Sequence, residues 1–168
     1  MGLLHISTNR AGRGIAELEQ ALALNRNLAA AHGGVGLAKI FLGRAEESAA
    51  HVAVAFRIAP SDGAAYIWNQ ISGLAKLVLG ADEEAVELFR RSLDVNRTYP
   101  LSYFYIAAAL AHLGGLSEAR SEVRAGLALA PRFSIARFRA GSESDNPTYL
   151  EQRERIIEGM RKAGVPEE

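Results

Sequence analysis

The sequence predicts an all-α protein in which similar helix-turn-helix units stack side by side into a right-handed superhelical solenoid. Two fourteen-residue stretches, GLAKIFLGRAEESA from Gly36 and GLAKLVLGADEEAV from Gly73, agree at eight of fourteen positions. A weaker copy starts 34 residues later, at Ala107, and keeps the Leu-Gly pair. Periods of 34 and 37 residues are too long for a heptad and too short for a duplicated domain. Such spacing is typical of stacked helical repeats.

The same order of elements recurs around each copy. An apolar helix is followed by a glycine turn, an acidic start, and a second helix that ends at a break. Residues 1–26 are expected to form an incomplete first repeat, with a second helix at about 12–25. Three full repeats are expected at about 28–60, 61–97 and 98–131. The second is longer by three residues, which predicts that its first helix starts early, near Asp62.

The tail, residues 133–168, departs from this pattern. FSIARFRA predicts a short helix, and GSESDN predicts a loop. Asn146 and Pro147 then suit the cap and the first position of a helix that continues to Gly164. Its apolar side comprises Tyr149, Leu150, Ile156, Ile157 and Met160. We expect this C-terminal helix to cap the open face of the last repeat.

The repeated positions carry a family resemblance. Small residues recur in the first helices at Gly36, Gly73 and Ala107, and in the second helices at Ser48, Ala85 and Ala119, each followed four residues later by Val52, Phe89 or Val123. In these positions the chain resembles the tetratricopeptide-repeat (TPR) family over roughly residues 12–132. It departs from the pattern at the expected aromatic positions, which hold His32, Asn69 and Tyr103, and at the terminal prolines, replaced by Arg26 and Arg97.

Stacked pairs would bury a core that no single pair could close. The side chains expected in it are Leu42, Leu79 and Leu113 at the turns, with Val52, Ile58, Leu88, Phe89, Leu93, Leu127 and Leu129 from the second helices.

Composition limits the classes of function. The chain has 168 residues, 49% of them hydrophobic, which suits one domain with a buried core. Nineteen basic and nineteen acidic residues cancel, so the chain lacks the net positive field that attracts nucleic acid or anionic membranes. It has no cysteine, no secretory signal pattern and no apolar run long enough to span a bilayer. We therefore expect a soluble cytoplasmic protein or part of one.

The sequence contains no recognisable catalytic or metal-binding pattern. His5, His32, His51 and His112 have no partner at metal-ligand spacing. The glycines of HGGVGLAK lack the spacing of a phosphate loop and suit close helix packing instead. The repeated Glu46-Glu47 and Glu83-Glu84 pairs are interpreted as helix caps. We expect no enzyme, no cofactor and no metal.

Six arginines lie between residues 97 and 139, against two glutamates. They are Arg97, Arg120, Arg124, Arg132, Arg137 and Arg139. Such arginines could meet phosphates or an acidic partner. Since no exposed aromatic residues are interleaved with them, we interpret them as a solvated basic face and predict no nucleic-acid partner. The neutral net charge likewise predicts no membrane partner.

The TPR resemblance implies a ligand groove lined by the first helices. The corresponding inward positions are Leu37, Ile40, Phe41, Gln70, Ile71, Leu74, Leu77, Val78, Phe104, Tyr105, Ala108 and His112. An open apolar groove needs a cover. A protein or peptide segment with an apolar face, a second copy of the chain, or the chain's own tail would each serve. The leading hypothesis is a non-enzymatic protein-protein interaction module, and the alternative is a homo-oligomerisation domain.

A second resemblance concerns the tail. GIAELEQALALN, the enlarged unit and YLEQRERIIEGMRKAGVPE are similar to the C-terminal repeat region of certain bacterial class III adenylate or guanylate cyclases. This implies a regulatory or scaffolding part of a larger signalling protein, which would also account for an opening in mid-repeat. No catalytic residue carries over.

Overall fold

The computed structural model describes residues 11–60, 63, 65–142 and 144–168, and all regular structure in them is helical. The elements are α2 (Ala11–Leu24), α3 (Ala29–Phe41), a 3-10 turn (Ala45–Glu47), α4 (Ser48–Ile58), α5 (Ala65–Val78), α6 (Asp82–Val95), α7 (Pro100–His112), α8 (Leu116–Leu129), α9 (Ile135–Ala140) and α10 (Pro147–Ala163). The expected early helix start near Asp62 falls outside the described residues.

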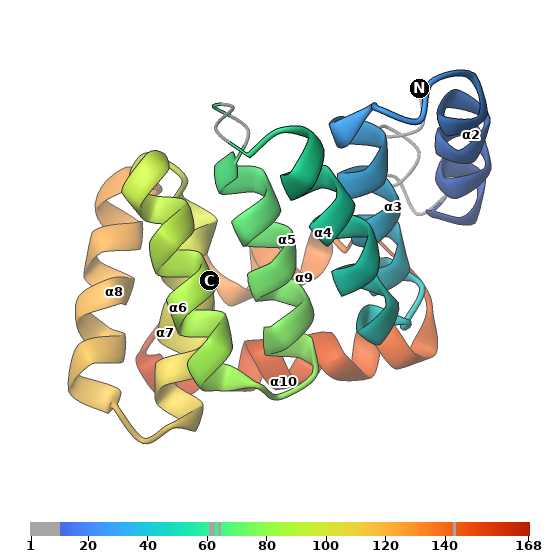
Figure 1. Ribbon diagram of the computed structural model, residues 1–168. Helices are drawn as coiled ribbons and strands as arrows, with labels where there is room; N and C mark the ends of the chain where they lie inside the picture. The colour runs from blue at the N-terminus through green and yellow to red at the C-terminus, as the bar shows by residue number, and fades with distance from the viewer. Residues whose placement is uncertain (1–10, 61–62, 64, 143) are drawn as a thin grey trace.

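The helices α3 to α8 form three consecutive pairs that stand side by side, with α2 before them (Figure 1). Each pair packs within itself and against the next pair, which produces a row of helices and one continuous core. The predicted all-α solenoid is confirmed.

One turn geometry is used three times. Gly43, Gly80 and Gly114 each end a first helix with a positive φ, of 72°, 79° and 84°, which is the left-handed region that glycine enters without steric cost. The next backbone N–H then reaches back to a carbonyl five residues earlier. The three bonds run from Arg44 to Lys39 (2.9 Å), from Ala81 to Lys76 (2.9 Å) and from Gly115 to Leu110 (2.8 Å).

The helical glycines mark close approaches between helices. A Cβ atom on Gly36 would lie 2.9 Å from Cγ2 of Val52, and one on Gly73 would lie 2.9 Å from the ring of Phe89. These are equivalent contacts between the first and second helices of two repeats. A Cβ on Gly33 would lie only 2.1 Å from the ring of Trp68, in the next repeat. The expected role of Gly33 and Gly36 as close-packing residues is confirmed.

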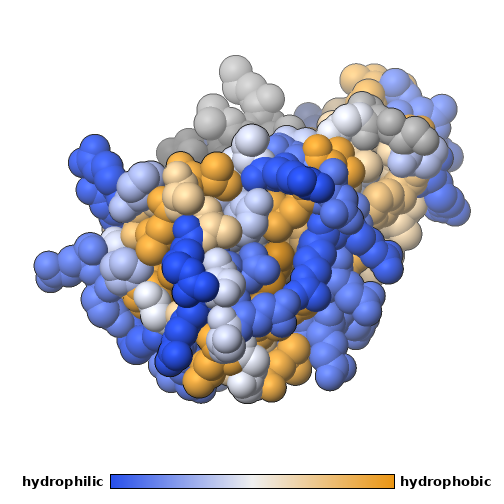
Figure 2. All heavy atoms as spheres, turned by 90° about the vertical axis from the view of Figure 1, so that its left-hand side faces the viewer, coloured by the Kyte–Doolittle hydropathy of each residue, from blue (hydrophilic) through white to orange (hydrophobic). Residues whose placement is uncertain are grey.

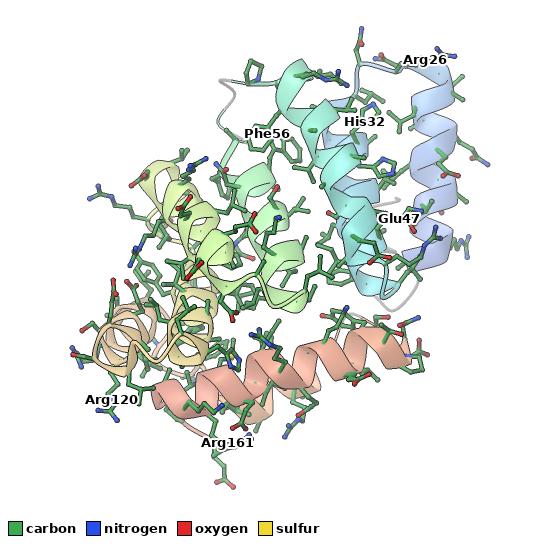
Figure 3. All side chains as sticks on the ribbon, turned by 60° about the horizontal axis from the view of Figure 1, so that its bottom comes forward. Arg26, His32, Glu47, Phe56, Arg120 and Arg161 are labelled. Carbon is green, nitrogen blue, oxygen red and sulfur yellow. The ribbon has the colours of Figure 1, made fainter. Side chains whose placement is uncertain are left out.

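The departures from the family pattern have structural roles of their own. His32 Nε2 donates to the carbonyl oxygen of Arg26 at 3.1 Å, and Tyr103 Oη donates to that of Arg97 at 3.1 Å. In both cases a side chain near the start of a first helix holds the turn that enters it. Figure 3 shows His32 below Arg26 at this turn.

The core differs in part from the expected set. Val52 and Phe89 are buried, but Leu79, Leu113 and Leu129 are 48%, 46% and 45% exposed, so their assignment to the core was wrong. Leu79 and Leu113 follow the last residue of their helices, and Leu129 ends α8, so none of the three continues the inward helical stripe. Alanines of the first helices and apolar residues of α10 occupy the core in their place.

One acid of each repeated pair, Glu47 and Glu84, forms an ion pair with a lysine of the preceding helix. Lys39 Nζ lies 2.9 Å from Oε2 of Glu47, and Lys76 Nζ lies 2.6 Å from Oε2 of Glu84, which are equivalent pairs in two repeats. The hydrogen bond from Lys39, and then that from Arg44, hold the pKa of the Glu47 carboxyl below its ordinary value. Glu83 and Glu84 do lie in the first turn of α6, as expected, but no side chain accepts a capping hydrogen bond at α4 or α6, so the interpretation as hydrogen-bonded caps was wrong.

The carboxyl of Glu122 on α8 is expected to destabilise the folded state at neutral pH. It is half-buried, and loss of hydration raises its pKa above the ordinary value of 4.5. The folded state therefore binds the proton more tightly than the unfolded state, and stability is lost as pH rises through the folded-state pKa. We expect Glu122→Gln to raise the free energy of unfolding at pH 7, and this gain to vanish below about pH 4.5. Urea denaturation across pH measures it, with exposed Glu87→Gln as the control.

Candidate functional site

The C-terminal helix α10 crosses the C-terminal ends of the first helices (Figure 1). At its start the ring of Tyr149 packs edge-on against Phe41 of α3, with centroids 5.3 Å apart. Near its end a Cβ on Gly159 would lie 2.6 Å from the carbonyl oxygen of Ala108 in α7. The expected capping helix is therefore present, and its contacts extend from the last repeat back to the first.

Hydrogen bonds at Arg155 anchor the middle of α10. Arg155 Nη1 donates to Asp82 Oδ1 at 3.0 Å and to the carbonyl of Leu77 at 3.1 Å. Asp82 is only 8% exposed, so the pair is partly shielded from water. His112 Nε2 in turn donates to the carbonyl of Arg155 at 2.9 Å. Helices α5, α6 and α7 are thereby joined to the tail.

Arg153 is a further anchor that sequence reasoning missed. Its side chain is buried and donates to the carbonyls of Phe138 and Arg139, the last turn of α9. The guanidinium carbon also lies 4.3 Å from the centroid of the Phe138 ring. A cation at a helix C-terminus complements the negative end of the helix dipole. Amphipathic periodicity alone could not predict that Arg153 is buried, because a charged residue interrupts the apolar stripe of the helix.

Between α3, α5 and α7 an apolar groove of about 370 Å³ remains open. We call it the groove. Its lining residues are Leu37, Phe41, Tyr66, Ile67, Gln70, Ile71, Leu74, Tyr99, Leu101 and Tyr105. None of them is charged. The amide Nε2 of Gln70 donates to the buried Ser102 hydroxyl at 2.9 Å, so this polar lining side chain is held in place by α7.

The structure brings six of the twelve predicted groove residues into this lining: Leu37, Phe41, Gln70, Ile71, Leu74 and Tyr105. The other six lie elsewhere. Ile40, Leu77, Phe104 and Ala108 are fully buried, and Val78 is 4% exposed. His112 is engaged by α10. These positions point between helices or lie under the tail, so they do not face the groove.

Four lining residues were missed, namely Tyr66, Ile67, Tyr99 and Leu101. Tyr66 and Ile67 precede Gln70 and Ile71 by one helical turn, so extending the inward stripe toward the start of α5 would have found them. Tyr99 and Leu101 flank Pro100 at the start of α7. They lie next to the expected boundary between the second and third repeats, and no sequence pattern marked them as inward-facing.

The described part of the chain holds neither a cluster of metal ligands nor a membrane-spanning helix. No group of three or more His, Cys, Asp or Glu side chains gathers there to hold a metal ion. Among the described helices none combines the length and the apolar character needed to cross a bilayer.

The six arginines of the basic end are all exposed. Arg139 pairs with Glu154, and Arg124 donates to Ser121 at 2.7 Å. Arg120 points away from the molecule (Figure 3). Hydrophilic and apolar residues are interspersed over the face seen from the α8 side (Figure 2).

The chain was compared with known proteins. No protein-family model matches it, and no curated protein matches it. Solved structures do match. A MamA structure (AMB-1) superimposes with a TM-score of 0.66 at 19% identity, covering 96% of this chain and 90% of that one. A second MamA structure gives a TM-score of 0.64 at 13% identity, covering 91% and 90%. YrrB, described as a TPR protein with an unusual peptide-binding site, gives 0.61 at 25% identity, covering 96% and 80%.

The fold is a TPR-like helical-repeat solenoid. At identities of 13–25%, the likeness establishes the architecture alone.

Proposed function

We propose that this chain is a non-enzymatic protein-protein interaction module whose groove binds an apolar segment of a partner protein. The main support is the groove, which stays open although the tail helix α10 packs against the same first helices. A cavity of about 370 Å³ accommodates one or a few large side chains.

The lining suits a protein ligand. Tyr66, Tyr99 and Tyr105 offer large apolar faces with a polar end, a combination that is enriched at protein interfaces. The absence of charge among the lining residues argues against a clamp for a terminal carboxylate in the groove. YrrB, a similar fold, is described as having a peptide-binding site, which supports the same class of ligand.

Selection from a displayed library of random twelve-residue peptides tests the proposal. We expect bound peptides rich in Leu, Ile and aromatic residues, and at least tenfold weaker binding to Ile67→Glu, because a charge would be buried against the ligand. Ile67 is half-buried, so the variant should fold. Val95→Glu, at a 55% exposed position outside the groove, is the matched control. Peptides that bind Ile67→Glu as well as the wild type would place the site elsewhere.

The alternative is homo-oligomerisation through the same groove. Light scattering over a range of concentrations separates the two. A dimer that Ile67→Glu dissociates favours the alternative, whereas a monomer at all concentrations favours an outside partner.

We also propose that the module is a regulatory or scaffolding part of a larger bacterial signalling protein such as a nucleotide cyclase. Support comes from the sequence resemblance alone, and its tail portion forms α10. Sequencing the coding region upstream tests this. A cyclase catalytic domain in the same reading frame would establish that the chain belongs to a cyclase, whereas an in-frame stop codon directly upstream would exclude it.

A further inference from the structure

A second cavity, of about 570 Å³, lies beside the groove at the far end of the solenoid. We call it the end cavity. It is lined by Pro100, Leu101, Ala130, Pro131, Arg132, Phe133, Arg137, Phe138 and Gly141. Leu101 lines both cavities, so the end cavity adjoins the groove.

The floor of the end cavity is held rigidly. The ring of Phe133 stacks on Phe104 with centroids 3.8 Å apart, and Phe138 lies 6.0 Å from Phe133. Phe138 is also contacted by the guanidinium of Arg153. Since the aromatic floor is already packed, little conformational entropy is lost when a ligand side chain rests on it.

The short helix α9, which forms one wall, is fixed at its start. Ser134 Oγ accepts the N–H of Arg137 at 3.2 Å. The N–H groups of Ile135 and Ala136 donate to the carbonyls of Pro166 and Glu167, at 2.8 and 3.0 Å. The wall that carries Arg137 is therefore positioned by the very end of the chain.

Two exposed arginines, Arg132 and Arg137, line this apolar cavity, and neither has a carboxylate partner within the described residues. Other tail arginines do find acids: Arg139 pairs with Glu154, and Arg161 with Glu158 and Glu167. The chain as a whole carries no net charge. Arg132 and Arg137 on one apolar cavity therefore make a local excess of positive charge.

We propose that the end cavity binds a large apolar side chain of a partner segment while Arg132 and Arg137 pair with an adjacent carboxylate. The ligand is then an acidic, apolar protein segment that continues from the groove. This rests on the proposed function and specifies the chemistry of its partner. Arginine suits the role because its planar fork forms paired, charge-assisted hydrogen bonds with a carboxylate.

The peptides selected on the wild-type chain provide the test. We expect Asp or Glu next to a Leu or aromatic residue to be enriched among them. The double variant Arg132→Gln/Arg137→Gln should bind them about tenfold more weakly, the loss expected for charged hydrogen bonds. The wild-type affinity should fall with added NaCl, and that of the double variant should fall less. Arg120→Gln/Arg124→Gln, which removes the same charge from exposed positions on α8, is the matched control and should bind as the wild type does.

The outcomes separate this proposal from the proposed function. Peptides that lose binding to Ile67→Glu but not to Arg132→Gln/Arg137→Gln overturn the acidic ligand and leave the groove in place. Peptides that respond to the arginine variant alone support the end cavity and overturn the groove. A dimer of the chain that the arginine variant dissociates would make a second copy the occupant and overturn an outside partner. A selection that yields no peptide counts against both.

Discussion

Phe104→Ala should lower the free energy of unfolding by about 3–5 kcal/mol, the range for deleting a fully buried aromatic side chain. Phe104 is 0% exposed. Its ring stacks on Phe133 and closes against Gly126, where an added Cβ would lie 2.9 Å away. One side chain therefore joins α7, α8 and the segment before α9. The close backbone at Gly126 and the stacked ring of Phe133 restrict collapse into the vacated space, so most of the cavity cost should remain.

Urea denaturation monitored by circular dichroism measures the loss. Phe56→Ala is the matched control, because Phe56 is only half-buried and lies beside an open cavity between α4 and α5 (Figure 3). We expect a clearly smaller loss there. Equal losses in the two variants would contradict the placement of Phe104 at the junction of the last repeat and the tail.

Gly159→Val should weaken the attachment of α10 and lower the free energy of unfolding by about 3 kcal/mol, as expected for overpacking against backbone. An added Cβ would lie 2.6 Å from the carbonyl oxygen of Ala108 and 2.8 Å from Nε2 of His112. The carbonyl belongs to a helix in the core and cannot move aside. The bond from His112 to the Arg155 carbonyl would be disturbed as well.

Hydrogen exchange on α10 reports this detachment directly. Amides of residues 147–163 should exchange faster in Gly159→Val, whereas those of α3 to α6 should change less. Glu151→Val, at an exposed position of the same helix, introduces the same side chain without the contact. If the two variants protect α10 equally, the close approach of α10 to α7 is not what holds the helix.

The sequence alone predicted much of the fold, because its information about the fold is local and repeated. The Leu-Gly pairs predicted turns, and each of their glycines adopts a positive φ. Asn146 and Pro147 predicted the start of α10, where Asn146 Oδ1 accepts the N–H of Tyr149 at 3.1 Å. Such signals act within a few residues of each other, so they can be recognised without knowing what packs nearby.

The candidate site was predicted less completely. A helical stripe predicts which side chains face inward, and six of the predicted twelve line the groove. It does not predict which part of that inner face another helix will cover. Ala108 and His112 are occupied by α10, which returns along the solenoid instead of only closing its end.

By itself, then, the sequence determined an all-helical chain of stacked pairs, the position of each turn, and an apolar inner face. Only the tertiary structure decided how much of that face stays open. The reason is that the contacts of the tail join residues far apart in the chain: Arg155 meets Asp82, and Phe133 meets Phe104. No local pattern encodes such pairings, because they depend on where a rigid helix comes to rest on the finished solenoid.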